Sequence, residues 1–182
     1  MDYPRHKIFI SFHHLDEAYK IELEKLLGSD YAISRSVQLG DIDPNNNTEY
    51  IRQLIRDKNL RDSSVTVVLI GKNTWKRKHV DWEIYSSMRK TKYNPRSGVI
   101  GIILPTRDDY GQNKAFNKYS IPPRLADNLD NGFVKIYDWS TNPLFYQKII
   151  HEAYERKDKI DPNLSRPMFG KNRSDDETRW YD

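Results

Sequence analysis

The strongest constraint on the fold is a set of short apolar segments that alternate with helical patterns along the chain. The clearest is 65–71, VTVVLIG, a β-branched run typical of a strand buried on both faces of a parallel sheet. Further strands are predicted at 7–12, 98–104 and 133–139, with a short, weaker one at 32–33. This order predicts a flavodoxin-like α/β fold of three layers: a mostly parallel, five-stranded sheet with helices on both faces.

The helix predicted after 65–71 carries the most suggestive carboxylate. Val80, Ile84 and Met88 recur every four residues and give this helix an apolar stripe. Glu83 lies beside the stripe, with His79 one turn earlier, just beyond the carboxyl end of a central strand. Ligands bind at that edge in open α/β sheets. A carboxylate near a helix start can equally serve only to stabilise the helix dipole, so position alone leaves both roles open.

Composition limits the class of protein. With 182 residues, 37% hydrophobic and 31% charged, the chain suffices for one domain, predicted at 1–160, followed by a tail at 161–182. The expected anchors of this tail are Met168, Phe169 and Trp180. The absence of cysteine excludes disulfides, thiolate catalysis and cysteine–zinc sites.

Charge and hydropathy exclude several partners. No apolar run approaches the roughly 20 residues that a transmembrane helix needs, and the N-terminal sequence does not resemble a signal peptide. We therefore expect a cytoplasmic protein that does not bind membranes. The net charge is +4, but basic residues are spread over the whole chain and do not cluster as in a nucleic-acid-binding face. We expect no nucleic-acid partner.

Several familiar catalytic motifs are missing from the sequence. It contains no G-x-G-x-x-G after the first strand, no G-x-x-x-x-G-K-[ST] and no G-x-S-x-G. The dinucleotide fold of the Rossmann type, P-loop phosphate transfer and the α/β-hydrolase elbow are therefore not expected. A phospho-receiver domain would need carboxylates at the ends of the first and third strands, where this chain has none.

The sequence His13-His14-x-Asp16 is a weak candidate metal site. Adjacent histidines at a strand end are expected to point to opposite sides, and no matching ligand set occurs elsewhere. We predict no metal site. Instead, one histidine is expected to cap the following helix and the other to line the crevice.

Five segments carry a resemblance to a known family: KIFISF, VTVVLIGKNTW, HVDWEI, VIGIIL and IPPRLADNLDNGFVKIYDW. In this order they resemble a TIR domain of the bacterial TIR-like branch, over about residues 7–156, and within that branch the ThsB-type proteins of the Thoeris anti-phage defence system. The resemblance implies cleavage of NAD+ as a substrate, without a further cofactor, and only Glu83 matches the position of the family's catalytic glutamate. His79 stands where the family often has tryptophan.

The predicted site follows from this resemblance and from the residues themselves. Glu83 is the predicted catalytic residue, and the predicted substrate-binding residues are Ser11, Phe12, His13, His14, Thr74, Trp75 and His79. The resemblance further implies a cyclic ADP-ribose isomer as a diffusible signal, a partner NADase effector (ThsA-like) that it activates, and self-assembly. Two alternatives remain open: a non-catalytic TIR scaffold that acts through assembly, and chemistry like that of nucleoside deoxyribosyltransferases.

Overall fold

A parallel sheet forms the centre of the molecule. The computed structural model describes residues 3–28, 60–91, 95–112 and 115–181. Within them the sheet has four strands in the order β1-β2-β3-β4: β1 (Ile8–Ser11), β2 (Val65–Ile70), β3 (Gly98–Ile103) and β4 (Val134–Asp138). The predicted α/β class and the four long strands are confirmed, whereas the strand predicted at 32–33 lies outside the described residues.

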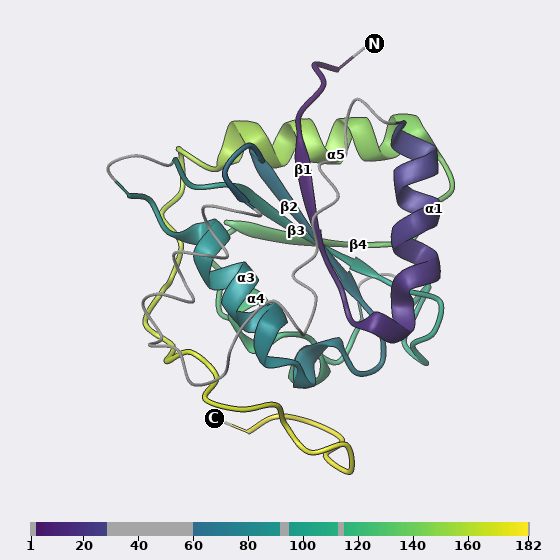
Figure 1. Cartoon of the computed structure of the whole chain (residues 1–182), viewed down its shortest axis with the longest axis vertical. Coiled ribbons are helices and arrows are strands. Elements are labelled where there is room, and N and C mark those ends of the chain that lie inside the picture. Colours follow the sequence, from purple (N-terminus) through teal and green to yellow (C-terminus); the bar gives the residue numbers. More distant parts are fainter. Residues whose placement is uncertain (1–2, 29–59, 92–94, 113–114, 182) are drawn as a thin grey trace.

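Helices cover both faces of this sheet, as predicted (Figure 1). The described helices are α1 (Glu17–Leu27), α3 (Lys78–Met88), α4 (Pro123–Ala126) and α5 (Pro143–Arg156). One apolar cluster joins the sheet to α1 and α5, and a second joins its other face to α3 and α4. Strands β1, β2 and β3 are buried along their whole length because both faces are covered, which explains their apolar sequences, whereas β4 is only partly buried.

The carboxyl ends of the strands meet at one edge of the sheet. Ser11, the last residue of β1, pairs with Val68 of β2, and β2 continues to Ile70 opposite Ile103. Short 3-10 turns follow both strands: η1 (His14–Asp16) after β1 and η3 (Thr74–Lys76) after β2. This edge therefore brings together the two segments in which the site was predicted.

The long connection predicted at 105–131 is partly helical. It contains η4 (Lys118–Ser120) and α4, which begins with a proline at its first helical position. The buried Arg107 stabilises the first part of this connection, because its guanidinium donates to both carboxylate oxygens of Asp109, at 2.8 and 2.6 Å.

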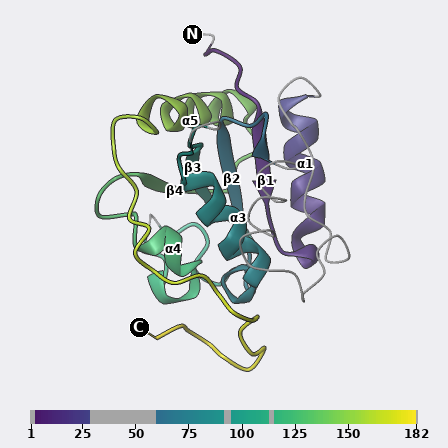
Figure 2. The same cartoon turned by 60° about the vertical axis from the view of Figure 1, so that its left-hand side comes forward.

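The segment 161–181 has no regular secondary structure but lies against α3 and α4 (Figure 2). Trp180 is 3% exposed and donates its indole N–H to Ile121 O at 2.9 Å. Trp82 of α3 donates in the same way to Phe169 O, also at 2.9 Å, and Met168 packs beside it. All three expected anchors thus contact the domain, while the boundary at residue 160 stays a prediction.

In the part of the chain that the structure describes, no helix has the length and apolar character needed to cross a membrane.

Candidate active site

The carboxylate of Glu83 meets the end of β1. Ser11 donates its hydroxyl to Glu83 Oε2 at 2.5 Å, and the two residues are 1% and 2% exposed. Glu83 reaches this point because α3 packs its apolar stripe, including Val80 and Ile84, on the sheet. A short bond from a hydroxyl to a carboxylate is among the stronger hydrogen bonds and fixes the direction of the carboxylate. The structure therefore places Ser11, a predicted substrate-binding residue, in contact with Glu83.

His79 joins the start of α3 to the end of β1. It lies four residues before Glu83 and thus on the same side of the helix. Its Nε2 lies 3.2 Å from Phe12 O, and because a carbonyl only accepts, Nε2 carries the proton. Burial lowers the pKa of His79, so the ring is neutral at pH 7. Its uncharged ring can position a substrate but supplies no positive charge.

His13 and His14 do not point to opposite sides, contrary to the prediction. Their ring centroids are 4.2 Å apart, because β1 ends at Ser11 and the chain turns into η1. His13 is the N-cap residue of this turn, and its Nδ1 accepts from Leu15 N at 3.4 Å. It is 1% exposed, whereas His14 lies at the surface. Burial, together with the charge of Arg77, lowers the pKa of His13 to about 4.

Thr74 and Trp75 lie in η3, within the segment that the sequence predicts as a polar loop. Thr74 is fully buried; its hydroxyl accepts from Gly71 N at 2.9 Å and donates to Leu69 O at 3.2 Å. The Trp75 side chain is 2% exposed and faces the guanidinium of Arg173 at 5.8 Å. In this structure the Thr74 hydroxyl stabilises the turn after β2, and the Trp75 ring packs under the C-terminal segment.

Gly71 explains why this turn can approach η1 closely. A Cβ atom at Gly71 would lie 2.1 Å from Asp16 Oδ2. Only glycine leaves room for the buried Asp16 side chain, whose pKa burial raises. The two 3-10 turns are therefore packed against each other at the carboxyl edge of the sheet.

A cavity of about 600 Å³ opens beside η3. Its walls come from the turn after β2, the loop after β3 and the C-terminal segment, and include Trp75, Arg107 and Asp175. Of the predicted site residues, it is lined by Trp75 and not by Ser11, His13 or Glu83. The cavity therefore includes Trp75 but not the Glu83 group.

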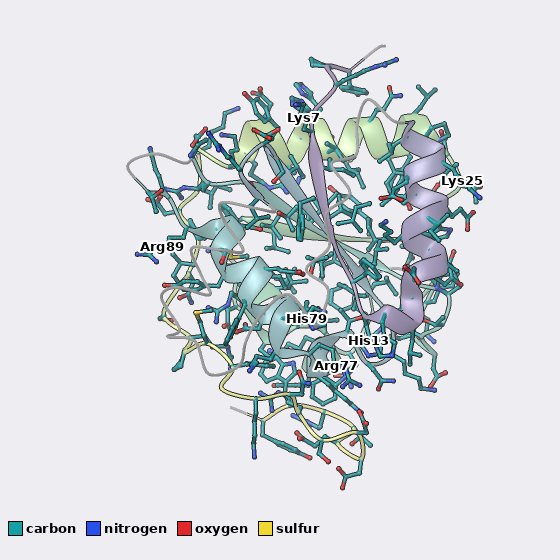
Figure 3. All side chains as sticks on the ribbon, in the orientation of Figure 1. Lys7, His13, Lys25, Arg77, His79 and Arg89 are labelled. Carbon is teal, nitrogen blue, oxygen red and sulfur yellow. The ribbon has the colours of Figure 1, made fainter. Side chains whose placement is uncertain are left out.

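Sequence reasoning missed Arg77, which directly precedes α3. Figure 3 shows its side chain beside His13 and His79, where β1 ends and α3 begins, whereas Lys7 and Arg89 lie elsewhere. Arg77 donates to Asp175 Oδ1 at 2.9 Å. The basic run Lys76-Arg77-Lys78 before the helix was the available signal, but the partner in the C-terminal segment could not be inferred from it.

No cluster of three or more histidine or acidic residues suited to a metal ion occurs within the described ranges.

A family model for the Thoeris protein ThsB, TIR-like domain, matches residues 9–109, more than half of the chain. The chain belongs to the Thoeris ThsB TIR-like family. The matched range begins in β1 and ends after β3, so it contains Ser11, His13, His79 and Glu83. This confirms the resemblance inferred from the sequence motifs, although the motifs extended it to about residue 156. A comparison with curated proteins gives no match.

Proposed function

We propose that this member of the ThsB TIR-like family cleaves the nicotinamide–ribose bond of NAD+, with Glu83 as the catalytic carboxylate. The observation that carries the proposal is the buried Glu83 carboxylate, held by Ser11 at the carboxyl edge of the sheet. This edge is where open α/β sheets bind ligands.

The reaction needs a stabilising anion more than a strong acid. When the C1′–N bond breaks, its electron pair stays with the ring nitrogen, and nicotinamide leaves as a neutral molecule. A ribosyl cation remains. The Glu83 carboxylate stabilises this charge and accepts a hydrogen bond from a ribose hydroxyl, while Ser11 keeps it oriented. Loss of such an interaction lowers the rate by about 10²-fold or more.

The neighbouring histidines suit a role in orientation. His79 is neutral because burial lowers its pKa, and its Nε2–H is already used by Phe12 O. Its position one turn before Glu83 allows its ring face to contact the substrate where the family often has tryptophan. Because Glu83 is 2% exposed, NAD+ reaches the carboxylate only when the residues that cover it are displaced.

The fate of the cation decides the product. Water would give ADP-ribose. If water is excluded, a hydroxyl or base nitrogen of the same ADP-ribose attacks C1′ and loses a proton, which gives a cyclic ADP-ribose isomer. In our proposal this isomer is a diffusible signal that activates a ThsA-like NADase effector in anti-phage defence. Membership of the ThsB family supports this part of the proposal.

The test is chromatography and mass spectrometry of NAD+ incubated with lysates from cells that make the full chain, with and without phage. We expect nicotinamide and a product with the mass of cyclic ADP-ribose, both lost in Glu83→Gln. Glu17→Gln, an exposed glutamate in the first turn of α1, is the matched control and should keep both products. If NAD+ is unchanged under infection and Glu83→Gln still protects cells, the non-catalytic scaffold replaces this proposal.

A further inference from the structure

His13 carries a buried N–H group that lacks a partner. Because its Nδ1 accepts from Leu15 N, the ring proton lies on Nε2. Within the described structure Nε2 has no hydrogen-bond partner, and the side chain is 1% exposed. A buried donor without an acceptor destabilises a fold, and a bound acceptor is one of the explanations for such a group. The natural partner of this N–H is an oxygen atom of a ligand.

A second donor of this kind belongs to Arg77. Its Nε is buried and also has no partner among the described residues. The positive charge of Arg77 acts on His13 strongly enough to lower the pKa of His13, so the two groups are close neighbours. Figure 3 shows their side chains together at the carboxyl end of β1. Two donors from different segments therefore converge on one place.

The groups around this place favour an anion. The ring of His14 lies 4.2 Å from that of His13, centroid to centroid, and Asp175 is the acidic residue that acts on His13. One carboxylate oxygen of Asp175 already accepts from Arg77 at 2.9 Å, although the Asp175 side chain is 80% exposed. Exposed ion pairs of this kind are weak and exchange readily. The Asp175 carboxylate thus accepts from one donor of Arg77, but it does not accept from Arg77 Nε or from His13 Nε2.

We propose that His13 Nε2–H and Arg77 form an anion subsite for phosphate groups, which an incoming phosphate enters by displacing the Asp175 carboxylate. Phosphate is the anion suited to several convergent donors, because it offers acceptor oxygens in all directions and pairs with guanidinium groups. Naming the ligand as the pyrophosphate of NAD+ rests on the proposed function. Arg77 precedes Glu83 by six residues, about 9 Å along the helix axis, which leaves room for a ribose between the subsite and the carboxylate.

The test compares ADP with adenosine, which differ by the pyrophosphate alone, in calorimetric titrations of the full chain. We expect ADP to bind at least about tenfold more tightly than adenosine. Arg77→Gln and His13→Phe should reduce this ratio to near one, whereas Asp175→Asn should increase it, because a competing carboxylate is removed. Arg61→Gln, an exposed arginine on the loop before β2, is the matched control and should leave the ratio unchanged. Thermal unfolding verifies that each variant folds. If His13→Phe does not fold, the result for Arg77→Gln decides the test.

Two results would overturn the subsite: no ADP binding at millimolar concentration, or the same ADP-to-adenosine ratio in Arg77→Gln and the wild type. Inorganic pyrophosphate separates the two sources of the ligand. If it binds as tightly as ADP, the site takes a free anion, and the assignment to the nucleotide is wrong. These titrations need no turnover. If the ADP-to-adenosine ratio depends on Arg77 but NAD+ is not cleaved, only the proposed function is contradicted. If NAD+ is cleaved but the ratio does not depend on Arg77, only the subsite is contradicted.

Discussion

Two carboxylates on one helix have different partners although both are buried. Asp81 and Glu83 are each 2% exposed and stand two residues apart on α3. The oxygens of Asp81 accept from Arg124 at 3.0 and 3.2 Å, and one also accepts from Phe169 N. Glu83 accepts from the hydroxyl of Ser11. On the side of α3 toward α4 and the C-terminal segment, Asp81 thus forms an ion pair with Arg124. On the side toward β1, Glu83 presents its carboxylate to the end of the strand.

The surroundings of Arg124 strengthen this contrast. Arg124 is fully buried and also donates to Arg166 O and Pro167 O, at 3.0 and 3.2 Å. The ion pair therefore holds the C-terminal segment on the domain as well as α3 on α4. Burial of a carboxylate alone therefore does not indicate catalysis, because Asp81 is as buried as Glu83 and is one half of an ion pair.

The largest expected effect is on the structural side of α3. Arg124→Met should lower the free energy of unfolding by about 3–5 kcal/mol, because it leaves the Asp81 carboxylate buried without its cation. Chemical denaturation measures this change. The double variant Asp81→Asn with Arg124→Met is the control and should recover part of the loss. A decrease below about 1 kcal/mol would show that the pair is not the stabilising feature described here.

On the chemical side, Ser11→Ala should act on turnover. If Ser11 orients Glu83, removal of its hydroxyl should lower kcat/KM for NAD+ about tenfold, equivalent to about 1.4 kcal/mol. Steady-state kinetics measures this effect. Ser165→Ala, at an exposed serine of the C-terminal segment, is the control. An unchanged kcat/KM in Ser11→Ala would show that Ser11 does not orient Glu83.

Acid should destabilise the end of β1. The pKa of His13 falls from 6.5 to about 4 on folding, so the unfolded chain binds this proton first. The stabilisation is present above pH 6.5 and is lost as the pH falls toward 4, by at most about 1.4 kcal/mol per pH unit for one proton. Unfolding of the wild type and of His13→Asn, measured across this window, isolates the contribution. Parallel curves for the two proteins would contradict it.

The smallest expected effect concerns the start of α3. Arg77, its N-cap residue, makes no capping hydrogen bond with its side chain, and Asn172 of the C-terminal segment accepts from Lys78 N at 2.8 Å instead. Asn172→Ala should lower the free energy of unfolding by about 0.5–1 kcal/mol, as for a lost cap. Lys171→Ala, at an exposed neighbouring position, should change it little. Equal effects in the two variants would show that Asn172 is not a cap.

Local patterns in the sequence predicted much of this architecture. The four described strands agree with the predicted ones to within one residue at each end, because apolar, β-branched runs indicate buried parallel strands. The stripe of Val80, Ile84 and Met88 predicted α3 and, with it, the position of Glu83. Both signals depend on residues close together in the chain.

The missed features depend on contacts between distant segments. Arg77 with Asp175 and Asp81 with Arg124 join residues separated by 98 and 43 positions, and no periodicity connects them. The predicted orientation of His13 and His14 was wrong. The prediction treated both residues as part of the strand end, whereas β1 ends at Ser11. The basic segment around Trp75 indicated an open loop, but Arg173 from the C-terminal segment lies over its ring.

The most direct test of the central claim is the amount of NAD+ and nicotinamide in infected cells that make the wild-type chain or Glu83→Gln. We predict that the wild type releases nicotinamide and that Glu83→Gln lowers this release about 10²-fold or more, with both proteins folded. Equal nicotinamide release by both proteins would contradict the assignment of Glu83 as the catalytic carboxylate.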